Sequence, residues 1–139
     1  MPAEFFLDTN VFIYTFDRRA PDKQASARSL VERALETGKG VVSSQVVQEF
    51  LNVALQKFER PLSADEALRY LREILEPLCA VFPSFALYEK ALSIQERWRF
   101  GFYDSLIVAS ALESDCEVLY SEDLQDGQEI ESLTIVNPF

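Results

Sequence analysis

The chain has 139 residues, 48% hydrophobic and 26% charged, which is the composition of an ordinary globular protein forming one domain over residues 1–139. It has no histidine and only two cysteines, which excludes a closed zinc site and a histidine general base. No stretch approaches the roughly 18 apolar residues of a membrane span, and residues 1–4 lack the flanks of a secretory signal. We therefore expect a cytoplasmic protein without membrane contact, whose Cys79 and Cys116 are reduced and buried.

The charge is unevenly distributed along the chain. Thirteen basic and 23 acidic residues give a net charge of −10. Arg99 is the last basic residue, and the residues after it contribute −9 of that total. Most of these acids are expected to lie on a solvated face. A broad phosphate-binding surface is disfavoured there unless a bound cation reverses the local sign.

The first half of the chain predicts two strands and two helices. Glu4–Leu7 is predicted as a short strand that ends at Asp8, and Val41–Val42 as a second strand. Apolar residues at helical spacing predict a helix over Asp22–Thr37, which ends before Gly38. A second helix is expected from Ser43-Ser44 to about Phe58, and Pro61 then breaks the chain.

The second half continues the alternation of helices and strands. Ser63 and Glu66 predict a capping box for a helix that buries one apolar face, and Ser84 predicts the cap of a helix that ends at Trp98. Asp104 is expected to open a helix over Ser105–Glu113. The buried face of the first of these helices is predicted to contain Ala67, Leu68, Leu71, Ile74, Leu75 and Leu78. The remaining strands are predicted at Ala80–Phe82, Val118–Tyr120 and Leu133–Val136.

Short apolar strands that alternate with amphipathic helices are typical of a parallel sheet covered on both faces. Ligands of such sheets bind at the carboxyl ends of the strands. Asp8 and the turn Ser121-Glu122-Asp123 both follow predicted strands, while Glu49 and Asp104 lie on helices that can flank the same edge.

Each of these acids has a plain structural interpretation when it is taken alone. A carboxylate at a helix start, such as Asp104, is commonly a cap. Glu49 is the least ordinary, because it sits among Val46, Val47, Phe50 and Leu51, and buried glutamates are rare unless they are paired or bind metal. Carboxylates gathered in one pocket repel one another and need a cation. Without histidine, the expected ion is a hard, oxygen-liganded one such as Mg²⁺ or Mn²⁺.

Together these segments resemble the PIN domain (PilT N-terminus) family of ribonucleases, and within it the toxins of VapC type. The resemblance covers the whole chain. It rests on four motifs in the family's order: Leu7-Asp8-Thr9-Asn10-Val11-Phe12, Ser44 through Glu49-Phe50, Tyr103-Asp104-Ser105-Leu106-Ile107-Val108-Ala109 and Tyr120-Ser121-Glu122-Asp123-Leu124.

The resemblance implies a three-layer α/β/α sandwich with a central parallel sheet. It also implies that Asp8, Glu49, Asp104 and Asp123 form an acidic quartet, accompanied by Asn10 and Ser121. The activity implied is hydrolysis of RNA phosphodiester bonds by water that one or two Mg²⁺ or Mn²⁺ ions activate, held chiefly by Asp8 and Asp104. A cognate antitoxin and a homodimer are the expected partners.

Two details of this assignment stay open. Glu122 and Asp126 compete with Asp123 for the fourth acidic position. Exposed apolar area around Leu55, Phe58 and Leu62 suits either an antitoxin or a second copy of the chain, but the same residues also suit the core.

Five basic residues near the acidic motifs are candidates for substrate binding: Arg18, Arg19, Lys23, Arg97 and Arg99. Solvated side chains are the alternative for each of them. Trp98 is expected in the core rather than stacked on a base. So few basic residues favour a narrow, loop-presented RNA target.

Three other functions were compared with these motifs. A haloacid-dehalogenase-like phosphatase needs a second aspartate where the chain has Asn10. A receiver domain needs a lysine at the end of its last strand, and no lysine follows Lys90 in this chain. Both fail on those residues. A catalytically silent PIN fold that only binds protein or RNA remains the alternative function.

Overall fold

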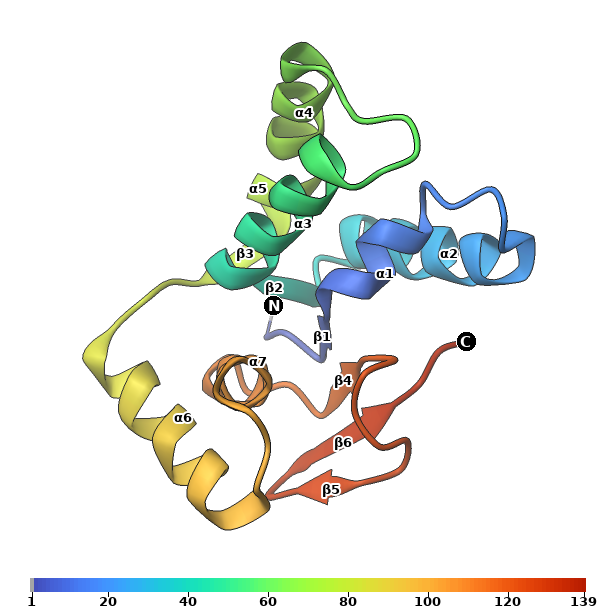
Figure 1. Ribbon diagram of the computed structural model, residues 1–139. Helices are drawn as coiled ribbons and strands as arrows, with labels where there is room; N and C mark the ends of the chain where they lie inside the picture. The colour runs from blue at the N-terminus through green and yellow to red at the C-terminus, as the bar shows by residue number, and fades with distance from the viewer. Residues whose placement is uncertain (1) are drawn as a thin grey trace.

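The structure, a computed structural model, describes residues 2–139 and has a central sheet with helices on both sides (Figure 1). The six strands are ordered β3-β2-β1-β4-β6-β5. Their bounds are β1 Phe5–Leu7, β2 Gly40–Ser43, β3 Cys79–Val81, β4 Val118–Tyr120, β5 Glu129–Ile130 and β6 Leu133–Val136. All neighbouring pairs are parallel except β5 with β6, which is antiparallel at the edge. The predicted central parallel sheet is confirmed, and β5 is an addition to it.

Helices cover the sheet as the alternating sequence predicts. In Figure 1, α6 and α7 lie together on one side of the sheet, and α1 and α2 lie on the other. The helical segments are α1 Thr9–Tyr14, α2 Pro21–Thr37, α3 Ser44–Gln56, α4 Ala64–Tyr70, the π-helix η1 Leu71–Leu75, α5 Glu76–Leu78, α6 Phe85–Trp98 and α7 Phe102–Glu113. No helix in the described part of the chain is both long and apolar enough to traverse a bilayer.

Serine caps start three of these helices where the sequence places them. The Ser43 hydroxyl accepts the Val46 N–H at 3.5 Å, and the Ser84 hydroxyl accepts the Leu87 N–H at 3.0 Å. Ser63 and Glu66 form the predicted capping box, with reciprocal bonds of 3.1 and 3.0 Å. These bonds satisfy amide groups that a helix start leaves unpaired.

The start of α7 differs from the prediction. The helix begins at Phe102 with Gly101 as its N-cap, so Asp104 lies inside the first turn and is not a capping residue. The prediction placed the boundary at the acid because helix starts favour carboxylates. The ring of Phe102 instead packs against a small cluster that includes Leu106 and Ala109, which draws the aromatic residue into the helix.

The core lies between the sheet and its helices, and Phe6, Leu7, Phe12 and Phe50 are fully buried in it. Trp98 is partly buried against this core, as expected. Leu68 was predicted to be buried, and this is wrong, since 42% of it is exposed. The π-helix η1 follows α4 directly, so the apolar face does not continue in one regular helical register.

The two thiols are unpaired. Cys116 is buried and Cys79 is half-buried, and burial raises the pKa of both. A raised thiol pKa keeps the group protonated and unreactive at neutral pH. The expected burial is therefore confirmed for Cys116 and is wrong for Cys79, which is only half-buried.

Candidate functional site

Asp8 lies at the carboxyl end of β1, between the ends of two neighbouring strands. It is 6% exposed and caps α1. Its backbone N–H donates to the Tyr120 carbonyl at 3.0 Å, which joins it to the end of β4. One carboxylate oxygen accepts the Thr9 N–H at 2.7 Å, and the other accepts the Ser121 hydroxyl, also at 2.7 Å. The Asp8 carboxylate is therefore fixed in orientation.

Glu49 reaches the same region from α3, the helix that follows β2. Its Oε1 accepts the Thr9 hydroxyl at 2.6 Å, and its Oε2 accepts the Gln45 amide at 3.3 Å. The side chain is half-buried. These donors account for a glutamate among apolar residues, because a buried carboxylate needs hydrogen-bond partners. Thr9 contacts both Asp8 and Glu49 and so joins the two acids.

The turn after β4 separates the three candidates for the fourth acid. Asp123 accepts the Asn10 amide at 3.1 Å, and its own N–H donates to the Ser121 hydroxyl at 3.2 Å. Glu122 instead accepts the Tyr14 hydroxyl and forms an ion pair with Lys23 at 3.2 Å. Asp126 accepts the N–H of Asn137. Only Asp123 of the three therefore contacts the residues around Asp8.

Asp104 completes the group from the first turn of α7. It is exposed, and its pKa is raised by partial desolvation and then by the negative charges of Asp123 and Glu49. The same two charges act on Asp8. Burial is the main reason why the pKa of Asp8 rises to about 6, with Asp123 and Glu49 adding to it and the bonds from Ser121 and Thr9 opposing it. The four carboxylates thus share one electrostatic field.

The donor atoms at this place suit a hard divalent cation. They are carboxylate oxygens, accompanied by the buried Asn10 Oδ1, which has no hydrogen-bond partner within residues 2–139. In the same residues, no three acidic side chains converge into a ready-made ion cage. Asp104 and Asp123 are exposed, so their side chains have room to turn toward the fixed carboxylates of Asp8 and Glu49. The residues therefore fit a hard cation at an open site rather than in a closed cage.

Most of the predicted substrate-binding residues already have other contacts. Arg19 is ion-paired with Asp17 at 3.1 Å, and Lys23 with Glu122. The guanidinium of Arg97 lies 5.3 Å from the ring centroid of Trp98. The backbone of Arg99 ends α6 in a left-handed conformation. Arg18 is exposed and faces a groove.

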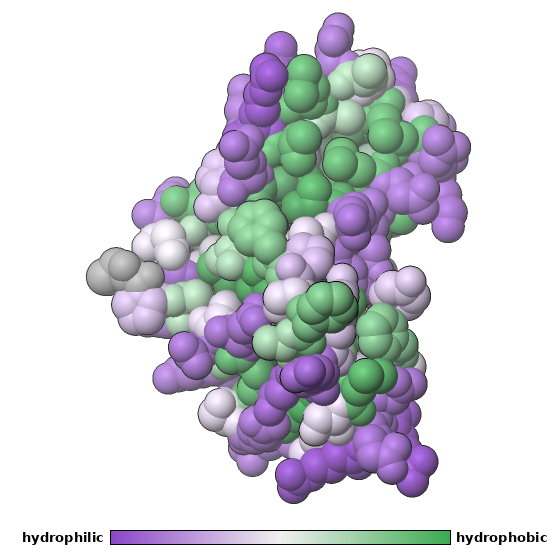
Figure 2. Space-filling model, turned by 90° about the vertical axis from the view of Figure 1, so that its left-hand side faces the viewer, coloured by the Kyte–Doolittle hydropathy of each residue, from purple (hydrophilic) through white to green (hydrophobic). Residues whose placement is uncertain are grey.

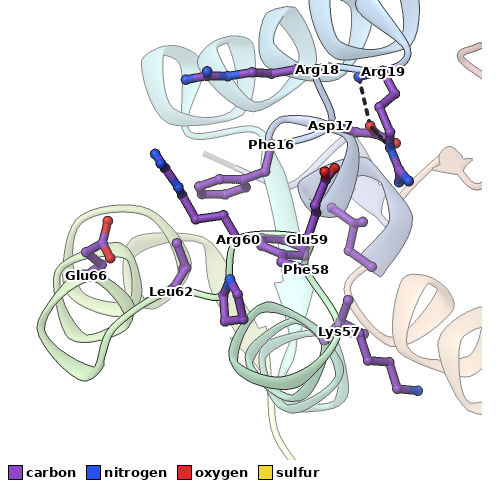
Figure 3. Close-up of a pocket in the computed structure, with 13 residues that line it drawn as sticks. Phe16, Asp17, Arg18, Arg19, Lys57, Phe58, Glu59, Arg60, Leu62 and Glu66 are labelled. Carbon is purple, nitrogen blue, oxygen red and sulfur yellow. Dashed lines mark hydrogen bonds and ion pairs between the residues drawn. The ribbon is translucent and has the colours of Figure 1, made fainter.

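The groove beside Arg18 has a volume of about 750 Å³, and it lies at the opposite end of α1 from Asp8. Phe16, Phe58 and Leu62 supply apolar lining, and Figure 3 shows Arg18 and Arg60 near them. The acidic group does not line this hollow. Two of the three predicted contact residues, Phe58 and Leu62, line it, whereas Leu55 does not.

Thr9 and Gln45 were not predicted as site residues. Gln45 precedes Glu49 by four positions on α3, and residues at this spacing share one helix face. That spacing is a signal the sequence contains. Thr9 is visible only as part of the run Asp8-Thr9-Asn10, because α1, which directs its hydroxyl toward Glu49, was not predicted.

Comparison with models of protein families shows to which family the chain belongs. The sequence profile of the PIN domain matches residues 5–125. The chain belongs to the PIN domain family. No curated protein sequence matches it significantly.

Solved structures share the fold of this PIN domain. A toxin–antitoxin complex from Klebsiella pneumoniae superposes with a TM-score of 0.68 at 21% identity, over 99% of this chain and 98% of that one. VapBC2 from Rickettsia felis, bound to a DNA fragment from its promoter, gives 0.59 at 18% identity, over 94% and 96%. FitAcB from Neisseria gonorrhoeae gives 0.61 at 18% identity, over 96% and 97%. The α/β/α architecture is therefore that of the family.

Proposed function

We propose that this PIN domain is a divalent-metal-dependent endoribonuclease and the toxin of a type II toxin–antitoxin pair. The observation that carries the activity is the buried Asp8 carboxylate at the sheet edge, in the field of Glu49 and Asp123, whose charges also act on Asp104. The toxin role is supported by the similarity of the fold to structures described as toxin–antitoxin complexes. Mg²⁺ and Mn²⁺ are the proposed ions.

The chain's own residues would bind and orient the reacting groups. Ser121 and the Thr9 N–H hold the Asp8 carboxylate, and the Thr9 hydroxyl holds Glu49. Asn10 orients Asp123. A bound divalent ion supplies water activation and charge neutralisation at the phosphate. Asp8 and Asp104 would hold it chiefly, with Glu49 and Asp123 completing the site directly or through water.

Cleavage assays with and without metal test this proposal. We expect the purified chain to cleave structured RNA in Mn²⁺, to stop in EDTA, and to bind Mn²⁺ in a calorimetric titration. Asp123→Asn is expected to lower kcat by at least about tenfold, because Asp123 accepts the Asn10 amide beside Asp8. Glu122→Gln should keep kcat within about twofold, because Glu122 pairs with Lys23 instead. Metal binding without cleavage of any RNA would support the silent binding module instead.

The proposed antitoxin contact is the groove beside Phe16. Its apolar lining is bordered by charged residues of both signs. The basic ones are Arg18, Arg19, Lys57 and Arg60, and the acidic ones are Glu59, Glu66 and Asp17, of which Asp17 is paired with Arg19. An amphipathic segment with apolar anchors and charged flanks of both signs fits this combination. Homodimerisation is proposed through exposed apolar residues that follow β3. Phe82 is 63% exposed and Phe85 is 86% exposed. Figure 2 shows the left-hand side of the molecule, where hydrophobic residues gather in the upper part and are scattered among hydrophilic ones below.

Phe16→Ala tests the antitoxin contact. Phe16 is 37% exposed in the groove, and Leu55, 39% exposed on α3, lies outside its lining and serves as a matched control. We expect the chain to arrest growth when it is expressed alone, and the co-expressed product of the adjacent gene to relieve the arrest. Phe16→Ala should reduce that relief and the co-purification, while Leu55→Ala changes neither. Equal loss of relief in both variants would contradict the assignment of the groove.

A further inference from the structure

Gln45 is a buried polar residue for which the acidic quartet alone gives no role. It is 7% exposed and lies one helical turn before Glu49 on α3. Its side-chain nitrogen donates to Glu49 Oε2 at 3.3 Å and to the Tyr103 carbonyl at 3.2 Å. Both partners are acceptors, so the amide must present its NH₂ group to them. The orientation of the side chain is thus fixed by its contacts.

These two bonds connect the elements that carry two of the acids. Glu49 belongs to α3, and Tyr103 immediately precedes Asp104 in the first turn of α7. The Tyr103 side chain is itself 67% exposed, so it is the main-chain carbonyl of this residue that is held by Gln45. Gly101, the N-cap of α7, has no side chain to fix the helix start. Gln45 therefore links the start of α7 to the Glu49 helix by side-chain hydrogen bonds.

The two oxygens of Glu49 also show why this link matters. Thr9 holds Oε1 and Gln45 holds Oε2, so the carboxylate is fixed at both ends. Removal of the Gln45 donor leaves Oε2 without this partner and lets the carboxylate rotate. Partners of this kind, one step from the reacting groups, commonly set how well a site binds and reacts.

We propose that Gln45 is a positioning residue that sets the separation of Glu49 and Asp104 for metal binding and RNA cleavage. This inference rests on the proposed nuclease function. Gln45 does not touch the substrate. It acts through the Glu49 carboxylate, which it holds at a fixed place relative to the main chain that presents Asp104. A methionine at this position keeps the length and volume but has no donor, and a glutamate would present acceptors to two acceptors.

The test compares Gln45→Met with Gln48→Met in the full chain. Gln48 is the same residue type on the same helix, but it is exposed. Gln45→Met is expected to lower kcat about 10–100-fold, to weaken Mn²⁺ binding in calorimetry about tenfold, and to leave KM for RNA within about twofold. Gln48→Met should leave all three unchanged. Circular dichroism confirms folding, and Gln45→Glu, expected to lose kcat similarly, replaces Gln45→Met if that variant does not fold.

A double-mutant cycle separates positioning from general structural support. If Gln45 acts through Glu49, Gln45→Met should change Mn²⁺ affinity less than about threefold in a Glu49→Gln background. The positioning role is overturned if the loss of Mn²⁺ affinity is the same in both backgrounds, or if Gln45→Met keeps the wild-type kcat and Mn²⁺ affinity. Cleavage by the wild-type chain still supports the nuclease function in either case. A wild-type chain that neither binds Mn²⁺ nor cleaves RNA overturns the nuclease function, and this inference with it.

Discussion

Asp8→Asn is expected to lower the kcat of Mn²⁺-dependent RNA cleavage by about 10²–10³-fold. The reason is charge rather than shape. A carboxylate at this position supplies several kcal/mol of interaction with a divalent ion and the charge it neutralises, and each 1.36 kcal/mol is a factor of ten in rate. An amide oxygen is a much weaker ligand for a hard cation.

The substitution keeps the local hydrogen bonds. An asparagine oxygen can accept the Thr9 N–H, and its NH₂ group can donate to the Ser121 hydroxyl, which now donates to Asp8. The variant should therefore fold, and growth arrest should disappear together with cleavage. Steady-state kinetics on one structured RNA measures the loss.

Asp115→Asn is the control for a change in net charge. Asp115 is exposed in the connection between α7 and β4, before the start of that strand, whereas Ser121 follows its end. Its backbone is in the left-handed region, with φ at 58°, which asparagine tolerates. It should keep kcat within about twofold. Full Mn²⁺-dependent cleavage by Asp8→Asn would remove Asp8 from the mechanism, and equal losses in both variants would attribute the effect to net charge.

The acidic group could be located from the sequence because each acid stands beside an apolar run. The run before Asp8 predicts a strand, and the carboxyl end of a parallel strand is where ligands bind. Glu49 is marked by its apolar neighbours, and the structure explains it by the donors Thr9 and Gln45. The parallel sheet could be predicted because burial imposes a regular spacing of apolar residues on its strands and helices.

The fourth acid, the helix α1 and the role of Gln45 could not be predicted from the sequence, because they depend on tertiary contacts. Glu122 and Asp123 are adjacent, and only the ion pair of Glu122 with Lys23 shows that their side chains face different partners. The helix α1 has six residues, too few for its apolar periodicity to be distinguished from that of a strand. The bond from Gln45 to Tyr103 spans 58 positions, so no local pattern contains it.

The metal-free protein is expected to become less stable, relative to Asp8→Asn, as the pH rises from 4 to 7.5. The pKa of Asp8 rises from its ordinary 3.8 to about 6, chiefly because the carboxyl is buried. The folded state therefore holds this proton more tightly than the unfolded state does. Stability from the protonated form is complete below pH 3.8 and is lost as the pH passes about 6. A shift of this size corresponds to about 3 kcal/mol.

Comparison with Asp8→Asn isolates this contribution. Other groups act in the opposite direction, since the pKa of Asp17 is lowered by its bond with Arg19 and that of Glu66 by its bonds with Ser63. These groups are the same in both proteins, so they cancel in the difference. Urea unfolding in EDTA should give nearly equal free energies of unfolding at pH 4. At pH 7.5 Asp8→Asn should be the more stable protein by about 3 kcal/mol.

Mn²⁺ should reverse this order at pH 7.5. An ion that binds only the folded state adds about 4.1 kcal/mol at a concentration 1,000 times its Kd, which exceeds the deficit of about 3 kcal/mol. The wild type should gain this amount, while Asp8→Asn, without the buried negative charge, gains much less. The ionised carboxylate that weakens the metal-free fold is thus the same group that makes the fold respond to the cation. Equal stabilisation of both proteins by Mn²⁺ would place the ion away from Asp8, and equal metal-free stabilities at pH 7.5 would contradict the raised pKa of this carboxyl.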